Sequence, residues 1–397
     1  MNPRLMIVVL AVVACHEKND PSRQKKISVT EPPKERVISR DLSWPSDWPM
    51  FLGNPHRNGN VLLHGTEARL LWKAKLGDAV FSSAAVVNDV VFVGSRDHHF
   101  YAIDARSGSI LWRFKTGNLI FSSAAVALGN IYVGSDDGHL YALDATSGAK
   151  RFAFKTEGEV RLSPAVWRGL VFFADSGFRA SGLLYALDAK TGEEKWRFQA
   201  GVARADWVAT SPTVYERAVY FATSTGYLYS VDANNGKEHW RKQVGVVRSA
   251  PTVYEGNVYA GTSDGHLVAV TTEAGREVWR AKAEAPVNAA PSIYNGVLYF
   301  RSDDRFLYAL DLAADGKLLW KYRTGQRFDT AKVETAPSVW GGIVYFGSDN
   351  NFVYAFEART GKKLWQFKTD AEVLAAPTIV DGVAYFGDAD GFVYAVK

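Results

Sequence analysis

Acidic residues group with glycine at several points of the chain, and oxygen ligands grouped in this way can bind calcium. The segment 388–391, Asp-Ala-Asp-Gly, resembles half of an EF-hand loop, and segments 136–138 and 303–304 are similar in composition. Each group, however, falls at the same point of a unit that recurs along the chain. Asp and Gly together are typical of tight turns. We therefore interpret these groups as turns and predict no metal site.

The histidines, which could bind a metal or act in catalysis, are scattered along the sequence. Four histidines lie at or beside the same turn in separate units, so we expect them to stay apart rather than to form a metal cluster; they are His98, His99, His139 and His266. The sequence contains no G-x-S-x-G elbow, HExxH motif or P-loop. The common hydrolase and nucleotide-binding sites are therefore excluded.

The recurring unit is marked by the pattern A-x-D-x-x-[ST]-G-x-x-x-W. Full copies span 102–112 and 186–196, near copies span 142–152 and 230–240, and looser copies span 269–279, 309–320 and 355–365. Tryptophan, or phenylalanine in one copy, ends each unit at intervals of 39 to 45 residues, at positions 72, 112, 152, 196, 240, 279, 320 and 365. This interval is the size of a β-propeller blade.

One unit predicts four antiparallel strands, over 83–87, 90–94, 100–104 and 110–115, joined by tight turns. A single four-stranded sheet leaves both faces wet, so neighbouring units must pack face to face. The motif Asp can bond the amides of its turn, and the Trp on the outer strand can lie against the adjoining blade. The structural docking residues are Trp72, Trp112, Trp196, Trp240, Trp279, Trp320 and Trp365.

Half a unit stands at each end of the repeats. The strand of Trp72 has no preceding Ala-x-Asp, and the last strand, with Ala395, has no following Trp. Pairing the two would complete an eighth blade and hide two sheet edges. We therefore predict an all-β, eight-bladed propeller over 44–397, closed by its N- and C-terminal strands; a seven-bladed ring would leave both half units unpaired.

The N-terminus reads as an export signal over 1–14. Arg4 is followed by ten apolar residues, too few to span a bilayer, and then by Cys15, the only cysteine. Val12-Val13-Ala14-Cys15 resembles a bacterial lipobox, which predicts lipidation of Cys15. Residues 15–43 have the composition of a flexible tether. His16 after the cysteine resembles lipoproteins of the outer membrane rather than those retained at the inner one.

The net charge of +4 comes from the first 40 residues, which carry eight Lys or Arg and four Asp or Glu. The remaining chain carries 38 basic and 38 acidic residues. A neutral body lacks the field that attracts nucleic acid, so we predict no such partner.

Extra residues mark a surface for a partner. The step from Trp to the inner-strand Pro or its equivalent takes 11 or 12 residues in six crossings but 16 after Trp196 and 17 after Trp320, and the turn after Ala174 is four residues longer than its counterpart. These insertions share one face of a meander. Two are neighbours and contain Phe178, Arg179, Arg204, Asp206 and Trp207, a mixture typical of protein interfaces; drift of loop length without function is the alternative.

The same face should hold the rim of the central channel. One residue per unit, three before the inner-strand Pro position, is expected there: Phe81, Phe121, Arg161, Ala209, Arg248, Asn288, Glu334 and Leu374. Because these eight rim residues differ in size and charge, the rim suits an extended peptide or loop better than a symmetric ion site. Arg161 and Arg248 join the candidate partner-binding residues.

These motifs resemble the tryptophan-docking repeats of the pyrroloquinoline-quinone (PQQ) dehydrogenase superfamily over about residues 44–397. Within it, the lipobox, short tether and single ring are similar to the BamB family. That resemblance implies a periplasmic lipoprotein on the outer membrane that binds BamA. It assigns partner binding to an Arg before Ser-Ala-Pro, here Arg248 in Val247-Arg248-Ser249-Ala250-Pro251, although Val246 and Val247 replace the family's Leu residues.

The superfamily's dehydrogenases bind PQQ and calcium in the channel, and many carry a vicinal cysteine pair that this chain lacks. We therefore predict a monomeric, non-enzymatic scaffold without a cofactor, lipid-anchored on the periplasmic side of the outer membrane, that binds another envelope protein. A PQQ-dependent oxidoreductase and a ligand-sensing propeller are the alternatives.

Overall fold

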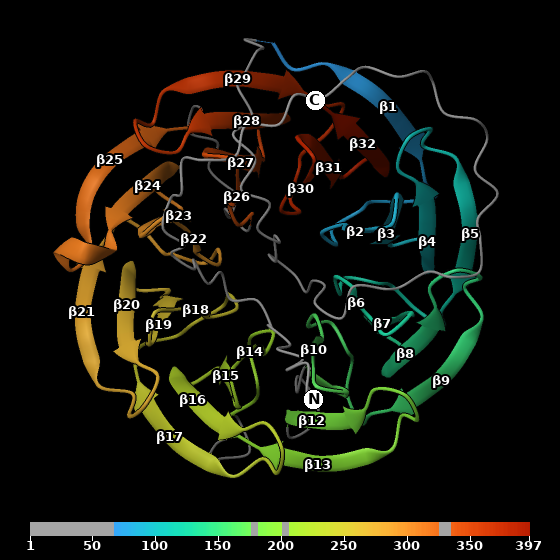
Figure 1. The fold of residues 1–397 in the computed structure, drawn as a ribbon, viewed down its shortest axis with the longest axis horizontal. Helices are drawn as coiled ribbons and strands as arrows, with labels where there is room; N and C mark the ends of the chain where they lie inside the picture. Colours follow the sequence, from blue (N-terminus) through green and yellow to red (C-terminus); the bar gives the residue numbers. More distant parts are fainter. Residues whose placement is uncertain (1–66, 176–181, 201–205, 325–334) are drawn as a thin grey trace, which may run out of the picture.

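Eight four-stranded antiparallel sheets surround a central axis as the blades of a propeller (Figure 1). The computed structural model describes residues 67–175, 182–200, 206–324 and 335–397. The eight-bladed all-β prediction is confirmed. In these ranges the one helix is a short 3₁₀ turn, η1 (Leu312–Ala314), so no described helix is long and apolar enough to cross a membrane.

The first four blades follow one another along the chain, each with its shortest strand innermost. Blade 1 contains β2 (Ala85–Val87), β3 (Val90–Gly94), β4 (His99–Asp104) and β5 (Ile110–Lys115). Blade 2 contains β6 (Ala125–Ala127), β7 (Asn130–Ser135), β8 (His139–Asp144) and β9 (Lys150–Lys155). Blade 3 contains β10 (Ala165–Trp167), β11 (Leu170–Ala174), β12 (Leu183–Asp188) and β13 (Glu194–Gln199). Blade 4 contains β14 (Thr213–Tyr215), β15 (Ala218–Ala222), β16 (Tyr227–Asp232) and β17 (Glu238–Gln243).

The remaining blades continue this order until the last one, which takes strands from both ends of the chain. Blade 5 contains β18 (Thr252–Tyr254), β19 (Asn257–Gly261), β20 (His266–Thr271) and β21 (Glu277–Lys282). Blade 6 contains β22 (Ser292–Tyr294), β23 (Val297–Arg301), β24 (Phe306–Asp311) and β25 (Lys317–Arg323). Blade 7 contains β26 (Ser338–Trp340), β27 (Ile343–Ser348), β28 (Phe352–Glu357) and β29 (Lys363–Lys368). Blade 8 contains β30 (Thr378–Val380), β31 (Val383–Gly387), β32 (Phe392–Val396) and β1 (Leu70–Lys75).

Blade 8 closes the ring as the two half units predicted. β1 lies antiparallel to β32 at the outer rim, with Trp72 opposite Ala395 (Figure 1). Arg69 and Lys397 exchange both backbone hydrogen bonds, at 2.7 and 2.9 Å. The two ends of the described chain are thereby fastened to each other, and neither terminal strand leaves its inner edge unpaired.

The repeated tryptophan holds each blade to the next. The indole of Trp72 is 8% exposed and donates its N–H to the carbonyl of Ala105 in blade 1 at 2.9 Å. Its ring lies against Gly108, where an added Cβ would sit 2.7 Å from Cε3. Asp104 fixes this turn, because its Oδ1 accepts from the amides of Arg106 and Ser107 at 3.1 and 2.7 Å.

The packing of this ring on a turn glycine recurs at six further junctions, with Phe152 in place of Trp at one of them, and is missing only at Trp365. Equivalent indole hydrogen bonds run from Trp196 to Ala233, from Trp240 to Thr272 and from Trp320 to Ala358, at 2.8 to 3.0 Å. Blade 8 has no turn between its third and fourth strands, since these come from opposite ends of the chain. Trp365 therefore packs into an apolar cluster with Ala68 and Trp340 instead of against a turn glycine.

The inner strands are shorter than predicted. The first was expected from Ser83 but begins at Ala85. The residues before it turn toward the neighbouring blade, where the amide of Ser83 donates to Oγ of Ser123 at 2.9 Å. Backbone groups beside the channel thus bond between blades rather than within one.

Candidate functional site

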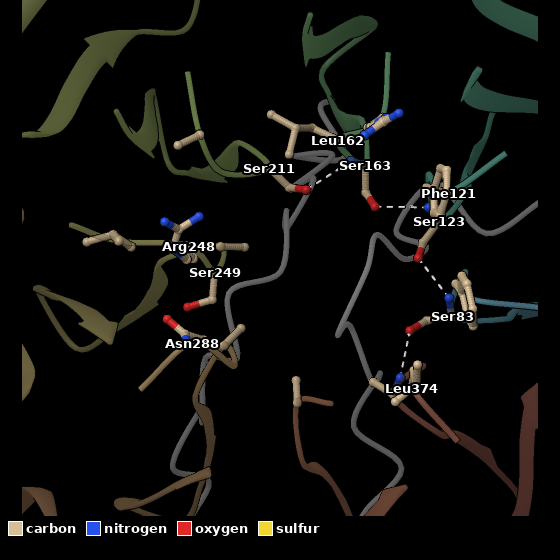
Figure 2. Close-up of a pocket in the computed structure, with 18 of the residues that line it drawn as sticks. Ser83, Phe121, Ser123, Leu162, Ser163, Ser211, Arg248, Ser249, Asn288 and Leu374 are labelled. Carbon is tan, nitrogen blue, oxygen red and sulfur yellow. Dashed lines mark hydrogen bonds between the residues drawn. The ribbon is translucent and has the colours of Figure 1, made fainter. Parts of the chain in front are cut away.

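A cavity of about 810 Å³ occupies the channel mouth, at the end of the ring where the blade-crossing segments meet. Its wall includes every described residue of the expected rim: Phe81, Phe121, Arg161, Ala209, Arg248, Asn288 and Leu374. The eighth position, Glu334, lies outside the described residues. Figure 2 shows several of these side chains facing one another across the channel. The cavity is large enough for a small ligand or for a few residues of a peptide.

One side of the mouth is aromatic. The rings of Phe81 and Phe121 are stacked, with centroids 6.1 Å apart and planes inclined by 19°. The guanidinium of Arg96 lies 5.5 Å from the centre of the Phe81 ring, and that of Arg161 lies 5.2 Å from the centre of the Phe121 ring. These planar groups offer a surface for apolar or aromatic side chains of a partner.

The charge of Arg161 is already compensated inside the protein. Its Nε and Nη2 donate to the two carboxylate oxygens of Asp136 at 3.0 and 2.9 Å, and Glu159 lies 3.0 Å from its Nε. Burial raises the pKa of Asp136, which is 7% exposed, although the hydrogen bonds of Arg161 act in the opposite direction. Arg161 is therefore engaged in an internal ion pair, and a partner would have to compete with Asp136 for its N–H groups.

The opposite side is polar and carries Arg248. This side chain is exposed, and among the described residues no carboxylate pairs with it. Beside it, Asn288 donates its amide to Asp303 at 2.9 Å and accepts from the hydroxyl of Ser263 at 3.1 Å. Figure 2 shows Arg248, Ser249 and Asn288 on the same side of the channel. Arg248 is thus the arginine of the described wall that is available to an anionic partner.

Two of the long segments meet next to the cavity. Trp207 lies on the cavity wall and is half-buried, and Gly182, at the end of the long turn of blade 3, packs directly on it. Asp206 is 4% exposed and accepts from the hydroxyl of Ser224 and the amide of Thr225, both at 3.2 Å. Asp206 therefore orders its own segment. Phe178, Arg179 and Arg204, also expected at this surface, lie outside the described residues, as does Cys15.

The acidic turns accept hydrogen bonds from their own blade and from the segment that crosses into it. Asp137 accepts from the amide of Gly117 and from the Tyr141 hydroxyl, both at 2.7 Å. Asp388 is fully buried and accepts from the Tyr394 hydroxyl at 2.8 Å. In the described ranges, no three His, Cys, Asp or Glu side chains gather as a metal site would require.

The described wall does not match a calcium and quinone centre. A calcium ion needs about six oxygen ligands, including carboxylates. The only carboxylate and the only side-chain amide on the described wall are those of Asp303 and Asn288, and these two bond each other. We therefore derive no chemistry through such a cofactor.

Comparison with known proteins agrees with the propeller fold. Residues 57–128, 117–250, 226–339 and 327–397 match the family described as outer membrane protein assembly factor BamB. None of the curated proteins matches the sequence.

Solved structures with the same fold come from proteins of different function. BamB from Moraxella catarrhalis is 18% identical with a TM-score of 0.69, over 83% of this chain and 99% of that one. Quinohemoprotein alcohol dehydrogenase from Comamonas testosteroni is 17% identical with a TM-score of 0.68, over 83% and 76%. The computationally designed Ika8 protein is 16% identical with a TM-score of 0.66, over 81% and 96%. At such identities these neighbours show the fold alone.

Proposed function

The chain belongs to the BamB family of outer membrane protein assembly factors, and from this premise we propose that it is a non-catalytic scaffold of the bacterial envelope. A lipid on Cys15 anchors it to the periplasmic side of the outer membrane. The ring acts as a monomer and binds another envelope protein, a BamA-like component of barrel assembly.

The observation that carries this proposal is the composition of the channel mouth. The half-buried rings of Phe81 and Phe121 stand opposite Arg248, whose charge no described carboxylate neutralises. Aromatic residues and arginine are the side chains that contribute most to protein interfaces. Trp207 adds a half-buried indole to the same wall. The segments with Phe178, Arg179 and Arg204 are proposed to extend this surface.

The same wall is also the reason why we propose that the protein is not an enzyme. The described wall residues are chiefly Ser, Ala and Val, and the charged side chains among them are Arg161, Arg248 and Asp303. Arg161 is engaged with Asp136, and Asp303 is hydrogen-bonded to Asn288. No general base stands here beside a nucleophile, which is the arrangement that acyl transfer or hydrolysis requires.

Capture of the partner from solubilised envelopes tests the proposal. Arg248→Ala and Trp207→Ala should each weaken capture, by about 30-fold if the side chain contributes about 2 kcal/mol as interface anchors do. Arg276→Ala is the matched control, since this exposed arginine lies in the turn between β20 and β21, at the opposite end of the ring. Capture unchanged in both mouth variants, or lost equally in the control, would count against this face.

A second assay separates the scaffold from an oxidoreductase. PQQ and calcium are added to the purified protein, and reduction of an artificial electron acceptor is followed with alcohols and sugars. We expect no substrate-dependent reduction. Turnover that requires both additions would overturn the non-catalytic assignment.

A further inference from the structure

Four serines form a hydrogen-bonded chain along one half of the channel. In blades 1 to 4 the residue just before the inner-strand Pro position is a serine: Ser83, Ser123, Ser163 and Ser211, here called the serine arc. Oγ of each later serine accepts from the amide of the serine one blade earlier, at 2.9 to 3.0 Å. Oγ of Ser83 accepts from the amide of Ala376 in blade 8 at 3.0 Å. Figure 2 shows this chain as dashed lines along one side of the cavity.

The other half of the ring lacks these hydroxyls. The same position is alanine in blades 5 to 8: Ala250, Ala290, Ala336 and Ala376, here called the alanine arc. An amide is left without an acceptor wherever the following blade carries alanine. Among the described residues this applies to the amides of Ser211, Ala250, Ala290 and Ala336, all of which line the cavity. Ala290 and Ala336 are 2% exposed, whereas Ser211 and Ala250 are half-buried. Because backbone amides in proteins are nearly always paired, four donors without a protein acceptor beside one cavity indicate an acceptor from outside the fold.

An independent observation comes from Ser249, the residue before Ala250. The hydroxyls at the equivalent position of blades 1, 2, 4 and 7 all bond the backbone of the second strand, as Ser82 does with the amide and carbonyl of Gly94 at 2.8 and 3.0 Å; the others are Ser122, Thr210 and Thr335. Ser249 is only 8% exposed, lines the cavity, and its Oγ has no partner. In Figure 2 its oxygen points toward Asn288, which lies on the same side of the channel. A buried hydroxyl that departs from its repeat, in a residue of the cavity wall, is a polar group that a ligand can satisfy.

The charge on this side defines the ligand. Arg248 stands two residues before Ala250 and has no carboxylate partner among the described residues. The carboxylate of Asp303 is on the same wall, but its Oδ2 already accepts from Asn288. Unpaired amides, a free hydroxyl and an uncompensated guanidinium all donate hydrogen bonds, so an anionic group with several acceptor oxygens fits them.

We propose that the alanine arc, together with Ser249 and Arg248, is a carboxylate-binding site on the wall of the channel. The carboxylate belongs either to a free polycarboxylic acid or to an acidic segment of a polypeptide inserted into the mouth. If the acidic segment belongs to the partner protein, the site explains how the proposed scaffold binds it. The site itself does not depend on the partner being an assembly protein.

The two halves of the ring supply the variants for a test. Ala290→Ser and Ala336→Ser, made together, place on the alanine arc the acceptors that the serine arc already has, and so satisfy the amides of Ala250 and Ala290 from within. Ser123→Ala is the matched control, because it frees the amide of Ser83 on the opposite side and leaves the alanine arc untouched. Titration calorimetry of the purified full-length protein uses two probes: citrate, and a tetra-aspartate peptide with blocked termini.

The proposal expects at least one probe to bind the unaltered protein at a single site, more weakly as salt is raised. Each hydrogen bond to a charged group is typically worth tenfold or more in affinity, so the double serine variant should bind at least tenfold more weakly. Ser249→Ala should also weaken binding, and Ser123→Ala should not. Binding of the peptide alone assigns the carboxylate to a polypeptide, and binding of citrate assigns it to a small acid.

Two results would overturn the site: no binding of either probe at millimolar concentration, or equal affinity in the unaltered protein and the double serine variant. Circular dichroism establishes that the variants are folded. The calorimetry needs no envelope protein, so a negative capture experiment together with positive titration rejects the scaffold and retains the site.

Discussion

Substitution of one turn glycine tests how the blades are held together. Gly108 has a φ of +73°, and an added Cβ would lie 2.7 Å from Cε3 of Trp72, across the junction between blades 8 and 1. Gly169 has nearly the same φ, +79°, but a Cβ there meets nothing within 4 Å. Alanine at either position carries the left-handed backbone penalty of about 1 to 2 kcal/mol. Only Gly108→Ala also has to displace the indole.

The added effect at Gly108 follows from what Trp72 loses. Its indole hydrogen bond to Ala105, 2.9 Å long, contributes about 1 to 3 kcal/mol because the donor is buried. Part of the burial of the ring, which is 8% exposed, is lost as well. We therefore expect Gly108→Ala to lower the free energy of unfolding by about 2 to 4 kcal/mol more than Gly169→Ala does.

Equilibrium urea unfolding, followed by tryptophan fluorescence and circular dichroism, measures this difference. Gly236→Ala repeats the test away from the closure, since its Cβ would lie 2.7 Å from Cε3 of Trp196. If Gly108→Ala and Gly169→Ala destabilise the protein equally, the stacked indole does not hold the blades and the reasoning is wrong.

Two further predictions concern the anchor and a buried carboxyl. Cys15→Ser should abolish incorporation of radiolabelled palmitate and release the protein from membranes on fractionation; a labelled, membrane-bound variant would refute the lipobox. Burial raises the pKa of Asp175, which is 1% exposed, above its ordinary 3.8, so that the unfolded chain releases this proton at lower pH than the folded one. The contribution of this group to stability is therefore present below pH 3.8 and is lost as the pH rises through the folded pKa. Asp175→Asn cannot ionise, yet it keeps an oxygen that accepts from the amide of Leu183. The thermal midpoint of this variant should therefore rise relative to that of the unaltered protein as the pH increases from 4 to 7. A difference in midpoint that does not change with pH would contradict the raised pKa.

The fold could be predicted from sequence because each of its determinants is local and is repeated. In blades 1 to 4 the Asp and Gly of the third turn are four residues apart, and Trp or Phe follows the glycine four residues later, so one unit explains the others. Closure of the ring could be predicted by counting the parts of each repeat. The segment of β1 has Trp72 but no preceding Ala-x-Asp, and the segment of β32 has Ala395 but no following Trp. The rim was predictable for the same reason: alignment of the units places one residue per blade at the mouth.

The serine arc shows what such alignment misses. Ser83, Ser123 and Ser163 stand 40 residues apart in the sequence, which is a visible signal, but the sequence does not show that each hydroxyl reaches the preceding blade. That depends on the rotamer and on the distance between blades. Ser249 looks like Ser82 in the sequence, and only its lack of a partner in the structure distinguishes the two.

A break in the repeat does not by itself indicate a site, as Arg301 demonstrates. The position of Arg301 in the second strand is glycine or alanine in the other seven blades, because a longer side chain there would meet the next blade. At Gly134, for example, a Cβ would clash with Val160. Arg301 occupies this position in blade 6, is 2% exposed, and bonds the carbonyl of Gly347 at 2.7 Å and the hydroxyl of Thr335. Burial lowers its pKa to about 10, and its guanidinium lies 4.7 Å from the centre of the Phe346 ring. This arginine fills the junction between two blades and does not line the cavity. The alanine arc differs because its unpaired groups belong to the cavity wall, and that location, rather than the departure from the repeat, is the reason to look for a ligand there.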